Sequence, residues 1–344
     1  MLVVGMDVHK DTVAVCAIDE AGRPVARTIV ENTRVGHRRL TRWITGLGAG
    51  VERCGLEHSG GIATVLARSL QSAGWKVVAV PPRLSARENG RLRTRGKSDP
   101  ADALAVARVV LREPKLPEVS AGSDKDLKLL VDYRDQLWGE RTRTANRLHA
   151  DLAIAYPGYQ RSLGRALTTK RSLQAAEDLV AADNSVRAEL DRARIARLHQ
   201  LDAEIKDLER RIGALVEASA SSLVSIVGIS ALTAARILGE VGDVRRFPTS
   251  STFASVTGTS PIPASSGRTE RHRLNRGGNR RLNRALYVVA LTQTRHEPRA
   301  VAYLERKRNE GKTRREAMRC LKRRLSDVVY RQMLLDAGAL DHRS

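Results

Sequence analysis

The sequence has few aromatic residues, few cysteines and no long hydrophobic run. Aromatic residues make up 3% of its 344 residues, so we do not expect a sheet that stacks nucleotide bases on exposed rings. Cys16, Cys54 and Cys320 are too scattered for a zinc site or a disulfide framework, which fits a reducing cytosol. No apolar run approaches the ~18 residues of a membrane span, and no cleavable leader or lipidation signal is visible. We therefore expect a cytoplasmic protein with no membrane partner.

Positive charge, by contrast, is abundant. The chain contains 60 Lys and Arg against 38 Asp and Glu, which gives a formal net charge of +22. An excess of this size destabilises a compact chain by self-repulsion unless a polyanion neutralises it, so nucleic acid is the expected partner. Because aromatic residues are rare, we expect contacts to the phosphate backbone. A nucleic-acid partner also leads us to expect a location at the nucleoid.

The first 115 residues have the pattern of an α/β domain. Residues 2–31 read as three consecutive strands, and further strands are predicted at 51–58 and 75–82. Helices are predicted at 34–47, from 60 to about 73, and from 99 onward. Three hairpin-type strands followed by alternating helices and strands predict a mixed sheet.

The middle of the chain, 116–220, is predicted to be a helical arm. Its apolar residues follow the three-four spacing of a heptad seam at Leu198, Leu201, Ile205, Leu208, Ile212 and Leu215. Two interpretations stay open. The helix packs within its own domain, or it forms a coiled coil that pairs protomers.

The last part, 221–344, is predicted to be a mostly α-helical domain. Its start, "SLVSIVGISALTAARILGEVGD", resembles a helix-hairpin-helix, in which turn amides and a helix N-terminus face a phosphate without reading bases. Ser230 stands where that motif usually has its second glycine. An ordinary helical turn is therefore the alternative.

Four acidic residues lie at the ends of predicted elements in the first domain: Asp7 and Glu57 on the first and fourth strands, and Asp99 and Asp102 in "GKSDPADALAVARVV". Each has an ordinary explanation alone, since the two aspartates suit a helix N-terminus. If the two strands are neighbours, however, the four carboxylates gather and repel one another unless cations lie among them. This pattern predicts a site for Mg²⁺ or Mn²⁺. Two such ions could stabilise a phosphodiester displacement.

A second candidate site lies in residues 258–291, "GTSPIPASSGRTERHRLNRGGNRRLNRALYVVAL". Ser265 and Ser266 precede a glycine, and a serine on a tight turn beside guanidinium groups could attack phosphorus. A plain polar loop is the alternative. Guanidinium groups bind phosphate oxygens bidentately, and the candidate nucleic-acid ligands are Arg268, Arg271, Arg273, Arg276, Arg280, Arg281 and Arg284.

These motifs resemble one known family. "GMDVHKDTVAV", "GLEHSGG" and "GKSDPADALAVA" resemble the ribonuclease-H-like (RuvC-like) DEDD domain of the insertion-sequence transposases called the IS one-ten family. "IVGISALTAARILGEVGDVRRF" and the serine segment resemble that family's C-terminal transposase domain. The likeness spans nearly the whole chain in the same order.

The resemblance implies a DNA transposase that acts on element ends and target. It implies divalent metal held by Asp7, Glu57, Asp99 and Asp102, and a covalent bond to DNA through Ser266, with Ser265 as the alternative nucleophile. It also implies a non-coding guide RNA. We further expect a dimer or tetramer with a composite site. The alternatives are a metal-dependent nuclease of the Holliday-junction resolvase type, without a covalent serine intermediate, and a non-catalytic basic nucleic-acid-binding protein.

Overall fold

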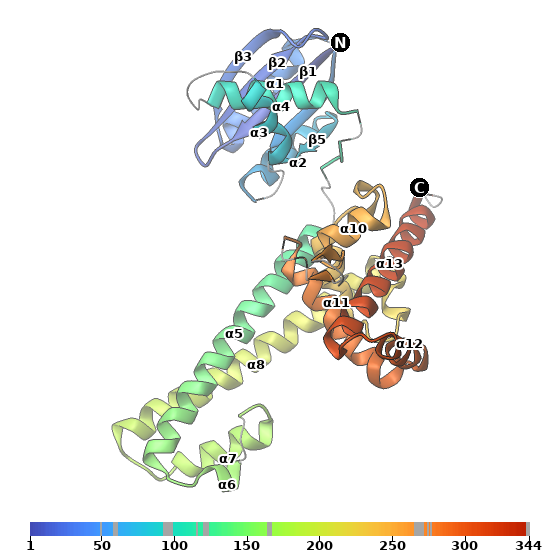
Figure 1. The fold of residues 1–344 in the computed structure, drawn as a ribbon. Coiled ribbons are helices and arrows are strands. Elements are labelled where there is room, and N and C mark those ends of the chain that lie inside the picture. Colours follow the sequence, from blue (N-terminus) through green and yellow to red (C-terminus); the bar gives the residue numbers. More distant parts are fainter. Residues whose placement is uncertain are drawn as a thin grey trace. The chain divides into compact units, whose positions relative to one another are not determined.

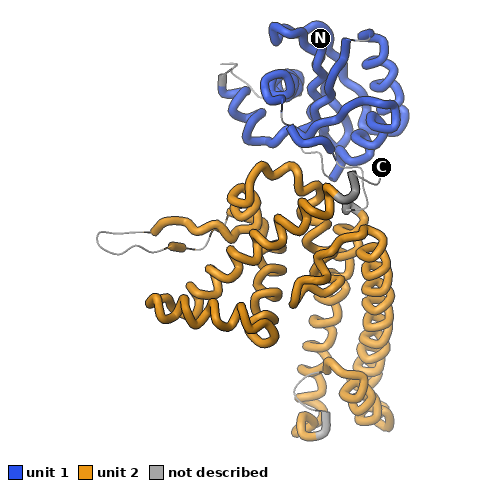
Figure 2. Tube along the Cα trace, turned by 90° about the vertical axis from the view of Figure 1, so that its right-hand side faces the viewer, with its two compact units in different colours: residues 1–122 blue, residues 123–344 orange. Residues whose placement is uncertain are grey.

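The structure is a computed structural model that describes residues 1–48, 50–57, 61–91, 99–114, 116–119, 124–163, 167–264, 272–273, 275 and 277–341. The chain divides into two compact units, residues 1–122 and residues 123–344, which Figure 2 shows in different colours. Each unit has its own hydrophobic core. The two units are therefore described separately.

The first unit is built on a five-stranded mixed sheet. Its strands are β1 (Leu2–Val8), β2 (Thr12–Ile18), β3 (Pro24–Glu31), β4 (Val51–Glu57) and β5 (Val77–Val80). Their order in the sheet is β3-β2-β1-β4-β5. The pairs β1–β2 and β2–β3 are antiparallel, whereas β1–β4 and β4–β5 are parallel. This topology confirms the predicted α/β domain with a mixed sheet.

Helices cover both faces of this sheet (Figure 1). Helices α1 (Arg34–Gly46) and α2 (Thr64–Ser72) bury Leu40, Ile44, Leu66 and Leu70 against one face. Helix α4 (Asp99–Arg112) packs on the other face, and α3 (Pro82–Arg91) packs on α4. A 3₁₀ turn, η1 (Gly61–Ala63), leads into α2. Because parallel strands bring their carboxyl ends to one edge, this arrangement favours a site beyond the ends of β1 and β4.

The second unit begins with a long helical hairpin. Helices α5 (Asp124–Ala155) and α8 (Val186–Ala218) run side by side, and the short helices α6 (Gln160–Leu163) and α7 (Lys170–Val180) lie at the far end of the hairpin (Figure 1). Arg134 with Glu209, and Arg141 with Asp202, are ion pairs that link the two long helices in antiparallel register. The hairpin therefore pairs two segments of the same chain.

The predicted heptad seam lies inside this hairpin. Five of its six residues are buried, and Leu215 is partly buried: Leu198, Leu201, Ile205, Leu208 and Ile212 are each at most 5% exposed. At Leu201, Ile205 and Leu208 the seam packs with Leu137 of α5. The seam is thus covered by the same chain, as the first of the two interpretations expected, and it offers no free surface to a second protomer.

The remaining helices pack around one core. They are α9 (Ala231–Val241), α10 (Ser250–Val256), α11 (Arg280–His296), α12 (Pro298–Asn309) and α13 (Arg314–Asp341), with 3₁₀ turns η2 (Ser222–Ser225) and η3 (Val244–Arg246). A small hairpin joins β6 (Ile262–Pro263) to β7 (His272–Arg273). Phe253, Leu286 and Val329 are among the most buried residues of this core. Among the described residues, no helix is long and apolar enough to span a membrane.

The start of this region lacks the first helix of the expected motif directly before its turn. A single 3₁₀ turn, η2, precedes Gly228, which adopts a φ of 90°. Ser230 caps α9 by accepting a hydrogen bond from the Thr233 amide at 3.3 Å. The serine that replaces the usual glycine therefore acts as an ordinary N-cap. The segment gives no independent support for a helix-hairpin-helix.

Candidate functional site

The sheet of the first unit brings Asp7 and Glu57 to the same edge. In the parallel pairing of β1 with β4, Gly5 lies opposite Gly55 and Met6 opposite Leu56. Continuing this register by one residue places Asp7 beside Glu57. The alternation of a pleated strand puts both on the face of the sheet that Gly5 and Gly55 occupy, and that face is covered by α4.

Contacts with α4 fix where its first turn lies. The Arg53 guanidinium, near the middle of β4, donates to the backbone carbonyls of Val110, Glu113 and Pro114 at 3.0–3.3 Å. Gly55, two residues later, faces Val106 and Val110. Each step toward the end of β4 therefore meets an earlier turn of α4. Glu57 comes two residues further on, which brings it toward the turn that begins α4.

Gly5 makes the same point from β1. A Cβ atom added there would lie 2.2 Å from the backbone nitrogen of Ala107 and 2.4 Å from the carbonyl oxygen of Ala103. Only a glycine lets the backbones of β1 and α4 approach so closely. Asp102 directly precedes Ala103, so this approach holds Asp102 near the carboxyl end of β1.

The Asp7 and Asp102 side chains are each held by a neighbouring residue. Asp7 Oδ2 lies 2.9 Å from His9 Nε2, and the Asp7 side chain is mostly buried. Asp102 Oδ1 accepts a hydrogen bond from Asn89 Nδ2 on α3. Both contacts hold a carboxylate in place.

The donor set is suitable for a hard divalent cation, because Mg²⁺ and Mn²⁺ prefer carboxylate oxygens. Within the described part of the chain, no group of three or more Asp, Glu, His or Cys side chains is placed to hold a metal ion. The Asp99 backbone opens α4, but its side chain lies outside that part. The strand register places Asp7 beside Glu57, and the close approach of β1 to α4 brings the turn with Asp102 toward the same edge. A shared metal site for the four acids stays a prediction.

Ser265 and Ser266 lie outside the described residues, as do Arg268, Arg271 and Arg276. The two strands that flank this segment are described, and they pair with each other: Ile262 lies opposite Arg273, and Pro263 opposite His272. Both ends of the serine segment are therefore held together by a short antiparallel hairpin. Arg273 is exposed, and in the described part of the chain its side chain has no ion-pair partner.

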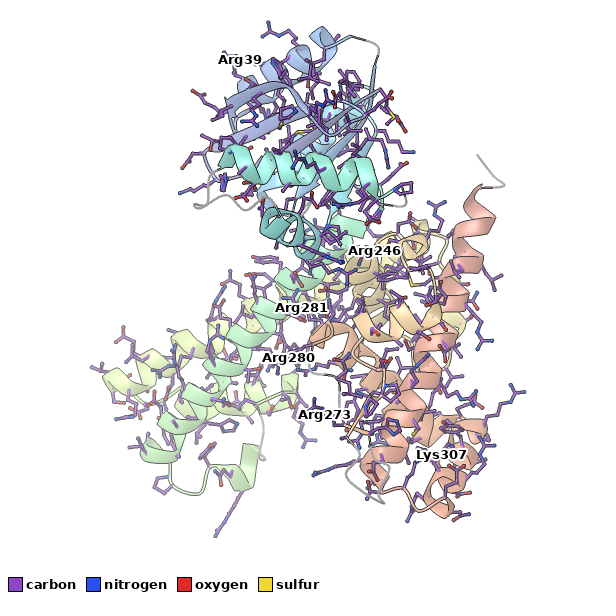
Figure 3. The ribbon with its side chains drawn as sticks, turned by 45° about the horizontal axis from the view of Figure 1, so that its top comes forward. Arg39, Arg246, Arg273, Arg280, Arg281 and Lys307 are labelled. Atoms are coloured by element: carbon purple, nitrogen blue, oxygen red, sulfur yellow. The ribbon has the colours of Figure 1, made fainter. Side chains whose placement is uncertain are left out.

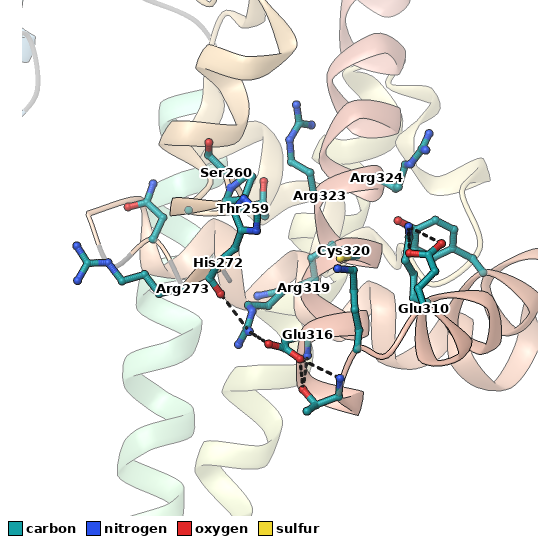
Figure 4. Close-up of a pocket in the computed structure, with 18 of the residues that line it drawn as sticks. Thr259, Ser260, His272, Arg273, Glu310, Glu316, Arg319, Cys320, Arg323 and Arg324 are labelled. Atoms are coloured by element: carbon teal, nitrogen blue, oxygen red, sulfur yellow. Dashed lines mark hydrogen bonds and ion pairs between the residues drawn. The ribbon is translucent and has the colours of Figure 1, made fainter. Parts of the chain in front are cut away.

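A cavity of about 680 Å³ lies against this hairpin (Figure 4). It is lined by residues from just before and just after the serine segment, together with α12 and α13. Seven Lys and Arg side chains line it, against three acidic ones: Arg273, Lys307, Lys312, Arg319, Lys322, Arg323 and Arg324, with Glu310, Glu316 and Asp327. Each acid is already paired with a cation of the same wall. The cavity therefore has an excess of positive charge.

Lys322 is the most buried of these cations. It is 6% exposed, and its Nζ donates to Asn283 Oδ1 at 2.7 Å. Asn283 Nδ2 in turn donates to the carbonyls of Thr257 and Gly258 at 3.1 and 2.8 Å. Burial, and then the positive charge of Arg319, lower the pKa of the Lys322 ammonium. No carboxylate among the described residues forms an ion pair with it.

The described arginines of the predicted set differ in their surroundings (Figure 3). Arg281 Nη1 lies 2.6 Å from Asp132 Oδ1 and 3.2 Å from Glu240 Oε1. Lys128 and Asn279 also bond to Glu240. Burial would raise the pKa of Glu240, but these hydrogen bonds outweigh it and lower that pKa. Arg281 is thus part of an ion-pair network that joins α11 to α5 and α9.

Like Arg281, Arg280 and Arg284 are exposed on α11. In the described part of the chain neither side chain has a hydrogen-bond or ion-pair partner. The sequence therefore predicts the same role for arginines whose side chains are engaged to different degrees.

Sequence reasoning missed the basic wall of α13. Arg319, Lys322 and Arg323 belong to a segment whose charge alone looks like a solvated helix face. A signal was present, however: Lys322 and Ser326 are four residues apart and stand directly beside the apolar repeat Leu321, Leu325 and Val329. A lysine at the border of a buried stripe either extends its ammonium group to solvent or binds something.

Comparison with known proteins assigns both halves of the chain. A DEDD transposase model of IS110 elements matches residues 4–157, and the model described as "Transposase IS116/IS110/IS902 family" matches residues 220–305. The two matches together cover well over half of the chain and lie in the order in which the resemblance placed them.

Individual relatives align over most of their length. The 42 kDa protein of insertion element IS900 from Mycobacterium paratuberculosis is 28% identical over 95% of this chain and 94% of its own. The 43.6 kDa protein of IS110 from Streptomyces coelicolor is 29% identical over 79% of each chain. The transposase for IS1111A from Coxiella burnetii is 24% identical over 78% of this chain and 71% of its own.

Among solved structures, RuvC of T. thermophilus in complex with a Holliday junction substrate matches 34% of this chain and 99% of its own. The sequence identity is 15% and the TM-score 0.28.

Proposed function

The chain belongs to the IS110 ("IS one-ten") family of transposases, and from this premise we propose that it cuts and rejoins DNA strands to move an insertion sequence. In this proposal Asp7, Glu57, Asp99 and Asp102 hold Mg²⁺ or Mn²⁺ at the scissile phosphate. Metal ions bound there would stabilise the charge that develops on the phosphate oxygens. The serine segment supplies the nucleophile.

The observation that supports the metal site best is the approach of α4 to the sheet. The pairing of β1 with β4 and the contacts of Gly5, Arg53 and Gly55 with α4 converge on one edge of the sheet. Asp7, Glu57 and the turn carrying Asp102 come from three elements that are distant in sequence. A purely structural role for each acid gives no reason for this convergence.

The serine step is a transesterification. The Ser266 hydroxyl oxygen forms a bond to phosphorus and loses its proton, while the bond from phosphorus to the departing sugar oxygen breaks and that oxygen gains a proton. Attack by a second sugar hydroxyl on the phosphoserine reverses the exchange and restores the serine. Ser265 remains the alternative nucleophile. The excess positive charge beside the flanking hairpin supports a phosphate at this place.

An Asp102→Ala variant tests the metal site. With Mg²⁺ and an element-end DNA, we expect cleavage to be lost while folding is nearly unchanged, because Asp102 is only half-buried. Glu113→Ala is the matched control: it removes the same charge from an exposed residue just beyond the other end of α4. Cleavage by Asp102→Ala at the wild-type rate would refute the role of this site.

Two further parts of the proposal concern partners. We propose that a non-coding RNA guides the choice of DNA and that the active form is a dimer or tetramer. Co-purification of a defined RNA that base-pairs with element and target would support the first part. A water-dependent nuclease, which uses the carboxylates without the serine, is the rival enzyme, and it predicts free DNA ends without a protein adduct.

A further inference from the structure

The cavity beside the β6–β7 hairpin has features of an anion site whose individual ligands the proposed chemistry does not name. Thr259, Ser260, His272 and Arg273 line it from the two sides of the hairpin, and α12 and α13 close it from the other direction (Figure 4). Arg319 Nη2 donates to the backbone carbonyl of His272 at 3.4 Å, which ties the hairpin to α13. The walls are therefore linked to one another rather than merely adjacent.

The charges on these walls do not balance. Glu310 neutralises Lys307, and Asp327 neutralises Arg323. Arg319 Nη2 lies 3.8 Å from Glu316 Oε1. Lys322 and Arg324 have no carboxylate partner within the described residues, and Arg324 lies 5.8 Å from the centre of the Tyr303 ring. A concave surface with unpaired cations concentrates an electrostatic field that attracts anions.

Lys322 is the most informative of these residues, because a buried ammonium group is costly unless it is paired. Its one hydrogen bond goes to the Asn283 amide oxygen, and the Asn283 amide nitrogen is committed to two backbone carbonyls. That commitment fixes which end of the amide faces Lys322. An ammonium group has three donors, so two remain without an acceptor in the described part of the chain.

We propose that this cavity binds a backbone phosphodiester of a nucleic-acid strand, with Lys322 as its buried ligand and Arg319 beside it. A phosphodiester carries one negative charge and two free oxygens, which suits the two unused ammonium donors. The Lys322 ammonium also lies 5.8 Å from the centre of the Tyr287 ring, but that contact supplies no anion. Binding would give Lys322 the anionic partner that no carboxylate among the described residues provides. The choice of a phosphodiester rests on the proposed function, whereas the need for an anion rests on the cavity alone.

The site is pre-built by the turn at residues 257–259. Gly258 has a φ of 68°. A Cβ atom added to Gly278 would lie 2.3 Å from the backbone nitrogen of Gly258. Gly278 thus packs directly on this turn, and Asn283 bonds to the same turn from the first part of α11. The elements that position Lys322 are therefore the ones that hold the base of the hairpin.

The test measures binding without chemistry. Full-length protein carrying Ser266→Ala is titrated in EDTA with a labelled duplex DNA and with an RNA strand, over a range of salt concentrations. Removing one phosphate contact lowers the slope of log K against log salt by about 0.9 for duplex DNA and about 0.7 for a single strand. We expect Lys322→Met to lower it by this amount with the nucleic acid that occupies the cavity, and Lys322→Arg to restore it.

Lys206→Met is the matched control, because Lys206 is exposed on α8 and carries the same charge. A slope change for Lys322→Met no larger than that for Lys206→Met, with both nucleic acids, would overturn the proposal. Because methionine is similar in length and uncharged, we expect Lys322→Met to unfold at the same temperature as wild type or higher.

A second measurement needs no loss of the lysine. The side-chain NMR signal of Lys322 Nζ, assigned by its disappearance in Lys322→Arg, should titrate at higher pH once the nucleic acid is bound. An unchanged titration would contradict the proposal even if the methionine variant failed to fold. If no covalent serine adduct forms but the slope and titration change as expected, the cavity assignment stands while the proposed strand exchange fails.

Discussion

Replacing Gly5 by alanine tests how β1 positions the first turn of α4. The added Cβ would lie 2.2 Å from Ala107 N and 2.4 Å from Ala103 O. Ordinary contacts between nonbonded carbon atoms begin near ~3.5 Å, so strand and helix must separate by roughly 1 Å. Neither obstacle can rotate away, because both are backbone atoms. Asp102 adjoins Ala103 and must move with it.

The expected cost has two parts. Overpacking a tight interior typically costs about 1–3 kcal/mol, and a shift of about 1 Å at a catalytic group lowers the rate by roughly 100-fold. Urea unfolding of the first unit can be followed by the fluorescence of Trp43 and Trp75 once Trp138 is replaced by Phe. Mg²⁺-dependent cleavage is measured on the same protein.

Two comparisons make this prediction sharp. Gly46 is in α1 with nothing within 4 Å of an added Cβ, so Gly46→Ala should stabilise the unit by up to about 1 kcal/mol. At Gly55 the obstacle is Val110 Cγ2 at 2.2 Å, a side-chain atom. Val110→Ala should therefore rescue Gly55→Ala but not Gly5→Ala. A Gly5→Ala protein as stable and as active as wild type would refute the inferred approach of α4.

Three further predictions follow from particular contacts. His37 is buried, its Nε2 bonds to Asn32 Oδ1, and burial lowers its pKa from 6.5. The first unit should therefore be most stable above pH 6.5 and lose stability as pH falls toward the lower folded-state pKa, by at most about 1.4 kcal/mol per pH unit. Constant stability across that pH range in urea unfolding would contradict this. Arg281→Ala should cost about 1 kcal/mol of stability and leave the salt dependence of DNA binding unchanged, because Asp132 and Glu240 engage the side chain. Arg280→Ala should lower the slope of that salt dependence with no loss of stability. The reverse pattern would make Arg281 a DNA ligand. Asp102→Ala mixed with Ser266→Ala should regain cleavage if the catalytic elements come from different protomers, and continued inactivity of the mixture would place them in one chain.

Much of the first unit could be predicted because its signals are local. Continuous apolar runs such as "LVVGMDV" and "TVAVCAI" are long enough for strands and are separated by short turns. Asp7 and Glu57 stand out because carboxylates are uncommon in strands. Their convergence followed from assuming that the first and fourth strands are neighbours, and the parallel pairing of β1 with β4 confirms that assumption.

The features that the sequence left open depend on partners far along the chain. The seam from Leu198 to Ile212 is equally compatible with a second protomer. The choice is made by α5, whose Arg141 and Arg134 pair with Asp202 and Glu209, 61 and 75 residues later in the chain. Lys322 reads as one of many solvated cations until Asn283 and the turn at Gly258 are placed beside it. No local pattern reports such a tertiary arrangement.

The most direct test of the account is to trap and locate a protein–DNA bond. Wild-type protein is incubated with Mg²⁺ and element-end DNA, denatured, digested with protease and analysed by mass spectrometry. We expect a nucleotide attached to the peptide that contains Ser265 and Ser266. It should be absent without divalent metal and absent in both Asp102→Ala and Ser266→Ala. Cleaved DNA with free ends and no attached peptide would contradict a serine nucleophile.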